Sequence, residues 1–504
     1  MTVLNYFIDA LQALCTFQGF LFVVIGTLAG VVLGAIPGLG SSTLMVILLP
    51  ISYRMSPTMA MALFKSITIG GMSGGCIGSI LLGIPGTSSS MLTVFDGYEF
   101  TKRGEPSKAL SAAVFANFLG NVPSVILAIA VTRAVAAWAV RLGPWEYAAL
   151  CFCAVLLVVG LSKGNMVKSM IGVGLAIFLA SVGADPINAS GRFLFFGRLE
   201  FLSGFNIISV MLGLFASKII LLEYARQSKV KEQKPVKVEG FKLPRKEIWK
   251  NKWLILRSWL FGAVIGFLPG LGGPVASVMA YSTEKMVAKD KSTWGHGEIG
   301  GVFSCEIANN AAIGGALIPL LALGIPGDAA GVQFIAALNI QGINVGPMFM
   351  REQAAIVYMI FAAALLSGII VFLFETLGMK TFPALLKIPY HFLYSVVILL
   401  AFLGAYMSTG SFYGLIVALA CCALGVAMDY FEIPSMPFLM AYILSPMLEL
   451  NIRRGFNYST RGGAEFFTRP FSCIFILVGI LVLAYGFASP AIKRAIAARR
   501  TPKG

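Results

Sequence analysis

The stretch GAIPGLGSST (residues 34–43) places a Pro-Gly pair, Pro37 and Gly38, directly after a long apolar run. Proline removes a backbone hydrogen-bond donor and glycine weakens a helix, so this pair predicts that a membrane helix breaks here. Unpaired backbone groups cost several kcal/mol each in hydrocarbon, so such a break cannot face lipid. We therefore expect this backbone to line a cavity or to be buried against protein.

The composition around this stretch is that of a polytopic membrane protein. The chain has 504 residues, of which 58% are hydrophobic and 12% are charged, whereas soluble domains carry about 25% charged residues. Apolar runs near the ~20 residues that cross a bilayer recur along the chain. They occupy residues 17–36, 148–161, 170–183, 205–222, 354–374, 392–407, 412–428 and 472–488. We expect an all-α, multi-pass protein embedded in the lipid bilayer.

The basic residues gather in loops between the apolar runs. Residues 224–252 hold ten Lys and Arg against three Glu, and the tail from Lys493 holds five basic residues and no acidic ones. Such clusters beside membrane segments mark the cytoplasmic side. Topology thus accounts for the net charge of +16, and we expect no nucleic-acid binding. We predict a cytoplasmic linker at 225–252 and a cytoplasmic tail at 489–504.

One group of arginines conflicts with that topology. Arg453, Arg454, Arg461 and Arg469 precede the last apolar run, whereas the basic tail follows it. A single span cannot place both groups in the cytoplasm, so the topology near the C-terminus stays open.

The cysteine and histidine patterns predict neither a metal centre nor a cofactor. The eight cysteines lie in apolar segments without a CxxC pair, and the two histidines are His296 and His391. Cysteines in such positions are typical of small packed or lipid-facing residues. We also expect no enzymatic activity, because the apolar segments hold no Ser/His, Cys/His or paired-Asp arrangement that would activate a nucleophile.

The opening motif occurs twice. GFLPGLGGPV (266–275) repeats it at an offset of 269 − 37 = 232 residues. A second pair, GGCIGSILLGIPGTSSS (74–90) and GGALIPLLALGIPGDAA (314–330), is offset by 326 − 85 = 241 residues. Two different motifs repeated in the same order indicate an internal duplication.

We predict a first membrane repeat at 1–224 and a second at 253–488, with opposite orientations. The helix before the first Pro-Gly motif begins at an almost uncharged side, whereas the helix before the second begins at the most basic loop of the chain. Opposite charges at equivalent points are what inverted repeats produce, and inverted repeats with broken or re-entrant helices are typical of secondary transporters.

The four helix breaks form the predicted substrate site. In secondary transporters, freed amides and helix N-termini hold anionic substrate, and freed carbonyls hold the coupling cation. Small hydroxyl residues after a break are also good N-caps, so structural capping is the alternative. The predicted substrate-binding residues are Pro37, Gly38, Gly40, Ser41, Ser42, Pro85, Gly86, Thr87, Ser88, Pro269, Gly270, Gly272, Gly273, Pro326, Gly327 and Asp328.

The segment FSCEIANNAAIGG (303–315) places Glu306, Asn309 and Asn310 in an apolar context. A helix would bring the three side chains to one face. A carboxylate with two carboxamides is an oxygen-rich site for a hard cation such as Na⁺, and interhelical hydrogen bonding is the alternative. Lys65 and Asp96 are lesser candidates. Lys65 either faces an anionic substrate or extends to the lipid headgroups, and Asp96 either contributes to the site or only begins the basic loop.

Several stretches together resemble the large membrane subunit of the tripartite tricarboxylate transporters. They are GAIPGLG, GGCIGSILLGIPG, FDGYEFTKRGEPSKAL, GFLPGLGG, EIANNAAIGGALIPLLALGIPG and FFTRPFS, and they extend over about residues 17–480. The resemblance implies a permease of elevator-like architecture in the bacterial inner membrane that imports organic anions, tricarboxylate- or dicarboxylate-like, together with Na⁺ or H⁺. It also implies two partners, a small membrane subunit and a periplasmic solute-binding protein.

Other functions stay open at this point. An intramembrane enzyme would need a positioned nucleophile and base, and a stand-alone ion-coupled transporter or a channel would need no binding protein. Duplicated broken helices favour alternating access over a fixed pore, and the chain has no P-loop motif for ATP-driven transport. Oxygen ligands without an evident buried, unpaired carboxylate favour Na⁺ slightly over H⁺.

Overall fold

The structure is a computed structural model that describes residues 3–36, 40–161, 166–185, 187–188, 190–218, 221–222, 237–346, 348–385, 390–459 and 461–500. The predicted all-α class is confirmed. Apart from one antiparallel pair of two-residue strands, β1 (Gly183–Ala184) and β2 (Gly191–Arg192), the regular elements of the described chain are helices. Six of these helices are long and apolar enough to cross a membrane. The chain is a multi-pass membrane protein.

The chain forms two compact units. Unit 1 comprises residues 1–137 and 215–408, and unit 2 comprises residues 138–214 and 409–504. Each unit therefore takes segments from both halves of the sequence. This division by packing does not test the boundaries of the two sequence repeats, which stay a prediction.

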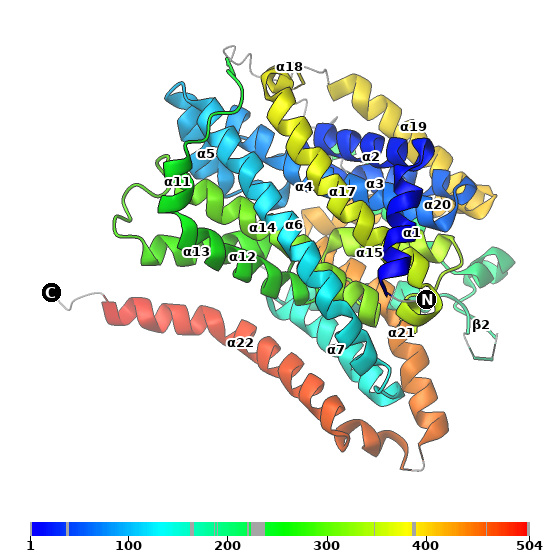
Figure 1. The fold of residues 1–504 in the computed structure, drawn as a ribbon. Helices are drawn as coiled ribbons and strands as arrows, with labels where there is room; N and C mark the ends of the chain where they lie inside the picture. The colour runs from blue at the N-terminus through cyan, green and yellow to red at the C-terminus, as the bar shows by residue number, and fades with distance from the viewer. Residues whose placement is uncertain are drawn as a thin grey trace. The chain divides into compact units, whose positions relative to one another are not determined.

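Unit 1 holds the helices that flank all four Pro-Gly motifs (Figure 1). Its helices are α1 (Val3–Cys15), α2 (Phe17–Ala35), α3 (Gly40–Leu48), α4 (Pro57–Leu82), α5 (Thr93–Lys102), α6 (Pro106–Ala139), α11 (Arg245–Lys250), α12 (Lys252–Phe267), α13 (Gly272–Val287), α14 (Ile299–Leu323), α15 (Ala329–Ile340), α16 (Phe349–Glu352), α17 (Ala354–Gly378), α18 (Phe382–Leu385) and α19 (Tyr390–Thr409). The last residues of α6 and α19 extend slightly past the boundary of the unit.

Glycine lets two helix pairs of unit 1 approach at backbone distance. Helix α2 packs along α4, and α12 packs along α14. A Cβ added at Gly34 would lie 2.3 Å from the carbonyl oxygen of Gly71, and one at Gly266 would lie 2.4 Å from that of Ala312. The two contacts are equivalent, because Gly34 and Gly266 are 232 residues apart and Gly71 and Ala312 are 241 apart. A larger residue would force either pair apart.

Helices α4 and α14 are the most enclosed spans. The most apolar window of each is 100% buried inside the protein, compared with 44% for α2. Both end at a glycine in the left-handed region, Gly83 with φ 69° and Gly324 with φ 73°, a conformation that strongly favours glycine at a helix C-terminus. Because protein rather than lipid surrounds them, these two helices can carry polar side chains at membrane depth.

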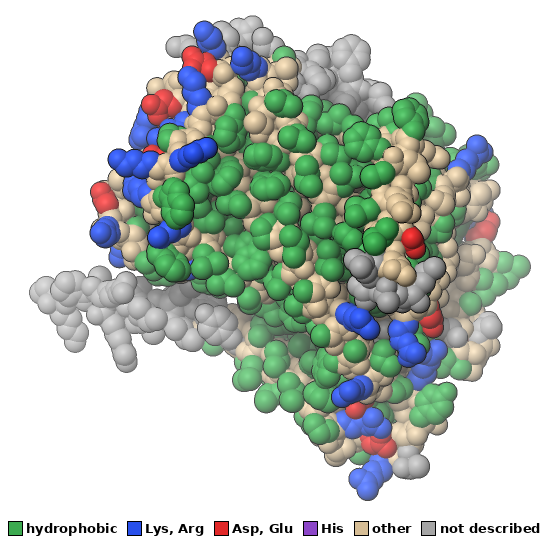
Figure 2. All heavy atoms as spheres, viewed as in Figure 1, with side chains coloured by type: hydrophobic (Ala, Val, Ile, Leu, Met, Phe, Trp, Pro, Cys, Tyr) green, Lys and Arg blue, Asp and Glu red, His purple; other side chains and the backbone are tan. Residues whose placement is uncertain are grey.

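The outer surface of unit 1 is apolar where the long helices are exposed. On the face shown in Figure 2, hydrophobic side chains cover the area of α6, α12 and α17, and Lys and Arg gather near α5 and α11. Exposed apolar side chains on these helices include Ile126, Leu260 and Leu373. Charge confined to the ends of an apolar surface is the pattern that a bilayer requires.

Unit 2 consists of fewer helices and the two short strands. Its helices are α7 (Pro144–Leu161), α8 (Met166–Ala180), α9 (Ile207–Met211), α20 (Phe412–Tyr430), α21 (Ser435–Tyr458) and α22 (Pro470–Arg500). Helix α7 packs against both α21 and α22, as Figure 1 shows, and α8 packs against α21.

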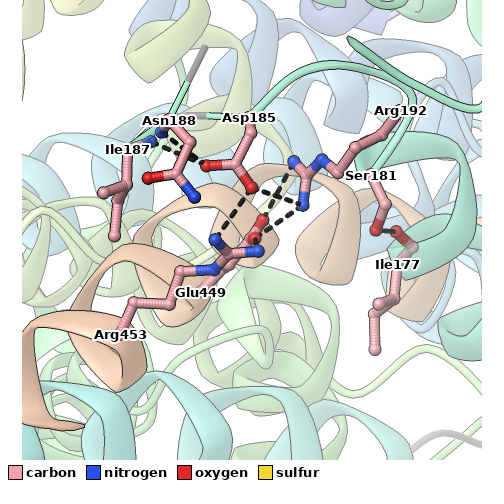
Figure 3. A network of polar contacts seen from close by, with 8 residues as sticks. All are labelled: Ile177, Ser181, Asp185, Ile187, Asn188, Arg192, Glu449 and Arg453. Atoms are coloured by element: carbon pink, nitrogen blue, oxygen red, sulfur yellow. Dashed lines mark hydrogen bonds and ion pairs between the residues drawn. The ribbon is translucent and has the colours of Figure 1, made fainter. Parts of the chain in front are cut away.

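An ionic network in unit 2 involves one of the arginines that conflict with the predicted topology (Figure 3). The guanidinium of Arg453 lies 2.8 Å from Asp185 Oδ2 and 2.8 Å from Glu449 Oε1. Arg192 joins from the other side, with Nη1 2.6 Å from Glu449 Oε1. Figure 3 shows both guanidinium groups directed at the same two carboxylates.

Arg469, another of these arginines, is also paired within unit 2. Its Nη1 lies 3.1 Å from Glu146 Oε1, and its Nη2 lies 2.9 Å from Glu465 Oε2. Carboxylates thus compensate the charges of Arg453 and Arg469 locally. These two arginines are therefore a weaker topology signal than their count in the sequence implies.

Candidate functional site

The two helix breaks of the second half meet through their backbones. Helices α12 and α13 flank one break, and α14 and α15 flank the other. The N–H of Gly270 in the first break donates to the carbonyl oxygen of Gly327 in the second, at 2.8 Å. The adjoining Pro269 and Pro326 therefore lie in one region.

Gly272 and Gly273, which begin α13, lie against two other predicted residues. Gly272 has φ 54°, and a Cβ added there would lie 2.7 Å from the Cβ of Asp328. A Cβ added at Gly273 would lie 2.1 Å from Asn309 Oδ1. Asp328 caps α15, because its Oδ1 accepts a hydrogen bond from the N–H of Gly331 at 2.7 Å. One oxygen of this carboxylate is thus engaged by the helix that follows.

The first break of the first half is described only in part. Pro37 and Gly38 lie outside the described residues. Gly40 begins α3 with φ 50°. Ser41 is buried against α4, and Ser42 is half-buried.

The second break of the first half closes onto α2. A Cβ added at Gly86, which follows Pro85, would lie 2.2 Å from the carbonyl oxygen of Gly34. The equivalent contact in the second half joins Gly327 to the carbonyl oxygen of Gly266, where a Cβ would lie at 2.9 Å. Each half of the chain therefore packs its GIPG loop against the helix that precedes its Pro-Gly motif.

The hydroxyl residues after the first GIPG bond one another. Thr87 Oγ1 lies 3.0 Å from Ser89 Oγ and 3.0 Å from Ser90 Oγ. Ser88 begins a short 3-10 helix, η2 (Ser88–Ser90). This arrangement fits the capping alternative, and the ligand-binding role of these residues stays a prediction.

The segments after the breaks also contact the opposite half of the chain within unit 1. Helix α15 packs against α3 and α4, and η2 packs against α13. Helices α3 and α13 follow equivalent Pro-Gly motifs, and η2 and α15 follow equivalent GIPG motifs. The two halves therefore make matching contacts around the breaks.

Glu306 and Asn310 belong to one buried polar cluster drawn from α4, α5, α6 and α14. Thr93 Oγ1 donates to Glu306 Oε1 at 2.5 Å, and Glu306 Oε2 has no hydrogen-bond partner in the described chain. Asn310 Nδ2 donates to Asn117 Oδ1 at 2.7 Å, and Ser73 Oγ donates to Asn310 Oδ1 at 3.3 Å. All five side chains are at most 1% exposed. Asn310 thus makes the interhelical hydrogen bonds that were its alternative role.

Asn309 differs from its neighbour. It is fully buried, and its side chain lies beside the Glu306 carboxylate without a hydrogen bond of normal geometry to any described residue. Leaving a buried polar group unpaired costs about 1–3 kcal/mol, and such groups call for a water, an ion or a ligand. Asn309, beside Gly273 at the start of α13, remains available to a ligand.

Glu375 in α17 is a buried carboxylate that the sequence analysis did not single out. It is 0% exposed, and its carboxylate lies near Asn117 without a hydrogen bond of normal geometry within the described ranges. It is close enough to Glu306 for the two carboxylates to repel each other. The sequence did hold a signal for this residue. A glutamate within the apolar stretch IIVFLFETLG (369–378) is energetically costly in hydrocarbon and typical of a functional position. It lies one residue past the apolar run 354–374, where a loop could have begun.

A small pocket in unit 1 lies between α4, α14 and the start of α15. Lys65, Thr68 and Asp328 supply its polar side chains. Ala330, Gly331 and Phe334 of α15 and four apolar residues of α14 complete the lining. Lys65 is only 5% exposed. Across the described chain, its ammonium has no ion-pair partner within 4 Å. Lys65, a lesser candidate from the sequence, is therefore a buried cation that shares a pocket with Asp328.

Asp96, the other lesser candidate, anchors a loop. Its Oδ1 accepts hydrogen bonds from the N–H groups of Gly295, Gly297 and Glu298 at 2.9, 2.9 and 2.8 Å. Its Oδ2 accepts a hydrogen bond from the hydroxyl of Tyr281 at 2.9 Å. These bonds fasten the loop before α14 to α5, a structural role for this carboxylate.

Comparison with known proteins identifies the family. The model of the tripartite tricarboxylate transporter TctA family matches residues 20–440. A protein of Agrobacterium vitis, described as an uncharacterized 52.8 kDa protein in the TAR-I ttuC' 3'region, is 30% identical over 457 residues, which cover 90% of each chain. A second, described as an uncharacterized protein in the TAR-II ttuC' 3'region of the same organism, is 30% identical over 220 residues, 44% of this chain and 91% of the relative.

No solved structure gives a significant match to the chain. The family match covers most of the sequence, and it includes all four Pro-Gly breaks and the polar cluster around Glu306. This protein therefore belongs to the tripartite tricarboxylate transporter TctA family, whose members are the large membrane subunits of these transporters.

Proposed function

We propose that this chain is the permease of a binding-protein-dependent transporter that imports organic anions across the bacterial inner membrane, driven by a gradient of Na⁺ or H⁺. Membership in a transporter family supports the general activity. The observation that carries the ion coupling is the buried cluster around Glu306, whose carboxylate has no ion-pair partner among the described residues.

The buried carboxylates of this region need a nearby positive charge if they are to be stable in their ionised form. Burying an ionised carboxylate is costly unless it is paired, and both Glu306 and Glu375 are 0% exposed without an ion-pair partner in the described chain. Two carboxylates that repel each other ionise together only when a cation is present, and otherwise one of them holds a proton. Both Na⁺ and H⁺ satisfy this requirement. The unpaired Glu375 removes the reason for preferring Na⁺ that the sequence alone offered.

The substrate site is proposed at the helix breaks. Helices α13 and α15 both begin at breaks whose loops are joined by the bond between Gly270 and Gly327. Two helix N-termini thus begin in one region, and each carries unsatisfied N–H groups and a partial positive charge. Such ends bind carboxylates, which suits an organic anion.

The proposed partners follow from the tripartite organisation of the family. They are a small membrane subunit and a periplasmic solute-binding protein that delivers the anion. An elevator-like movement remains part of the proposal. The described parts of all four breaks and of the Glu306 cluster belong to unit 1, which makes unit 1 the proposed transport domain.

Vesicle uptake tests the proposal. The chain, its small membrane subunit and the binding protein are reconstituted, and uptake of radiolabelled citrate, succinate or benzoate is measured under an inward Na⁺ gradient or an inward H⁺ gradient. We expect at least one anion to accumulate, chemically unchanged, under one of the two gradients and only with the binding protein present. Glu306→Gln and Asn309→Ala should each abolish accumulation.

Glu352→Gln is the matched control, because it removes the same charge from an exposed residue at the end of α16. It should accumulate the anion like the wild type. Uptake without either gradient, or without the binding protein, would overturn the corresponding part of the proposal. Chemical conversion of the anion would replace import with an enzymatic activity.

A further inference from the structure

The two enclosed helices carry opposite charges at equivalent positions. Lys65 in α4 and Glu306 in α14 are 241 residues apart, which is the offset of the two GIPG motifs. The same offset relates Thr68, in the pocket beside Lys65, to the unpaired Asn309. The duplicated helix thus has a cation at the position where its copy has an anion.

Helix packing supports this register. A Cβ added at Gly30 of α2 would lie 2.5 Å from the carbonyl oxygen of Ile67 in α4. One added at Gly262 of α12 would lie 2.4 Å from the carbonyl oxygen of Ala308 in α14. Ile67 and Ala308 are again 241 residues apart, so α4 and α14 are packed at the same register.

Each charged side chain faces the segment that follows the GIPG motif of the opposite half. Glu306 accepts a hydrogen bond from Thr93, which begins α5. Lys65 shares its pocket with Phe334 in α15. Thr93 and Phe334 are equivalent by the same offset of 241 residues. The Lys65 pocket and the Glu306 site are therefore two copies of one structural site.

The Lys65 pocket holds one carboxylate, that of Asp328, which attracts the ammonium without forming an ion pair within 4 Å. Lys65 is only 5% exposed. One oxygen of Asp328 is engaged by the N–H of Gly331. A buried ammonium is costly without a close counter-ion, so the pocket favours a further anionic group.

The start of α15 adds to this preference. Ala330 and Gly331 of the first turn line the pocket, and the helix is 12 residues long. Its N-terminus contributes a partial positive charge. The pocket has about 20 Å³ of space for a water-sized sphere, room for one or two waters. Such a space suits one carboxylate group of a substrate and is too small for a whole tricarboxylate.

We propose that the duplicated site has diverged, so that the Lys65 pocket binds one carboxylate of the transported anion and the equivalent Glu306 site binds the coupling cation or proton. This assignment rests on the proposed function above. It makes Lys65 the residue that selects for a negatively charged group. It also predicts that substitutions in the Lys65 pocket impair anion binding, whereas substitutions in the Glu306 site impair ion coupling.

Binding to the purified full-length chain tests the assignment without transport. Citrate, succinate and benzoate are titrated by isothermal titration calorimetry. For whichever of these anions the wild type binds, we expect Lys65→Gln to weaken binding at least tenfold. This loss corresponds to about 1.4 kcal/mol. Lys65→Arg keeps the charge and should retain part of the affinity. Lys291→Gln, which removes a charge from an exposed loop residue, should bind like the wild type.

A second variant leaves the lysine in place. Ala330→Asp puts a carboxylate into the first turn of α15, where acidic residues stabilise a helix, and there it competes with the substrate for Lys65. It should lower anion affinity at least tenfold, whereas Ala330→Asn, of nearly the same size, should not. This pair tests the pocket even if Lys65→Gln fails to fold. Glu306→Gln should remove the effect of Na⁺ or pH on anion affinity.

The outcomes separate this assignment from the proposed function. Normal anion affinity in both Lys65→Gln and Ala330→Asp, beside gradient-driven uptake by the wild type, would overturn the anion subsite and leave import intact. Equal losses in Ala330→Asp and Ala330→Asn would also overturn it, because size rather than charge would then matter. A wild type that neither binds nor accumulates any of the three anions would overturn both proposals.

Discussion

The backbone N–H of Gly270 donates a hydrogen bond to the carbonyl oxygen of Gly327, at 2.8 Å, and so joins two helix breaks that are 57 residues apart in the sequence. In the first half of the chain, the GIPG loop packs on α2, with Gly86 against the carbonyl oxygen of Gly34. The two breaks of the second half, each of which alone would be excluded from lipid, are tolerated because each is covered by the other.

Gly86→Ala and Gly327→Ala should destabilise the protein, because neither position has room for a methyl group. An added Cβ would lie 2.2 Å from the carbonyl oxygen of Gly34 in the first case and 2.6 Å from the Cβ of Ala316 in the second. Overpacking of this kind costs about 1–3 kcal/mol, and more where backbone must move. The thermal unfolding midpoint of the detergent-solubilised protein measures the effect.

Gly174→Ala in α8 is the control for this pair. An added Cβ there meets nothing within 4 Å, and alanine is about 1 kcal/mol better than glycine inside a helix. This variant should unfold at the wild-type temperature or above it. Unchanged midpoints for both Gly86→Ala and Gly327→Ala would show that the loops can shift, contrary to the tight packing described above.

Glu375→Gln should abolish gradient-driven accumulation without lowering stability. The carboxylate is buried and has no ion-pair partner in the described part of the chain, so replacing it with a neutral amide removes a desolvation cost rather than an attraction. We expect exchange of internal for external anion to persist, because exchange needs no net movement of the coupling ion. Counterflow, net uptake and the unfolding midpoint are measured on the same preparation.

The control is again Glu352→Gln, in the short helix just before α17. If Glu375→Gln accumulated anion as the control does, Glu375 would have no part in coupling. A large fall in its unfolding midpoint would instead indicate a stabilising ion pair at this position.

Asp96→Ala should loosen the loop that precedes α14. The substitution leaves the N–H groups of Gly295, Gly297 and Glu298 without their acceptor, at a cost of about 1–3 kcal/mol for each group that stays buried. Hydrogen–deuterium exchange of residues 293–300 should accelerate at least tenfold. Asp290→Ala removes a carboxylate of the same loop that bonds only Ser292, and it should leave that exchange unchanged. Equal exchange in the two variants would contradict the anchoring role.

Asp185 should make unit 2 sensitive to acid. The N–H groups of Asn188 and Ile187 donate to its carboxylate, and together with Arg453 they hold the pKa of Asp185 below its ordinary value. A lowered pKa stabilises the folded state above the ordinary pKa, about 3.9, and this contribution disappears as the pH falls through the lower folded value.

Asp185→Asn should therefore lower the unfolding midpoint at about pH 7 by several degrees and lower it less at about pH 3. The comparison of the two pH values, by scanning calorimetry or intrinsic fluorescence, checks the sign. Asp9→Asn, at an exposed position of α1, should behave as the wild type at both. An equal loss at both pH values would mean that packing rather than ionisation stabilises this network.

Much of the fold was accessible from the sequence because bilayers impose a simple pattern. The apolar runs predicted the all-α class, and structural helices occupy positions such as 17–35, 354–378 and 412–430. The spans α4, α6 and α14 were not among the predicted runs. Glycines and polar residues make α4 and α14 less hydrophobic than a span such as α17, and these residues are tolerated because protein encloses both helices.

The motifs of the candidate site could be predicted from the sequence, but the arrangement of their residues in space could not. The repeated Pro-Gly pairs placed the breaks, and the polar triplet placed Glu306, Asn309 and Asn310. Which of these side chains is hydrogen-bonded depends on partners such as Asn117 and Thr93, which are about 190 and 210 residues away in the sequence. Spacing within one segment cannot reveal such partners.

What the sequence by itself determined was the membrane class, the duplication and the family, because hydrophobicity, repeated breakers and motif order are local properties of the chain. The tertiary structure decided which polar groups remain unpaired. It paired Asp96 with a loop and Asn310 with Asn117. Among the described residues, it left buried Lys65 and Glu375 without an ion pair and Asn309 without a hydrogen bond of normal geometry. Charge compensation depends on distances through space, and in a membrane those distances decide which side chains are left to bind an ion or an anion.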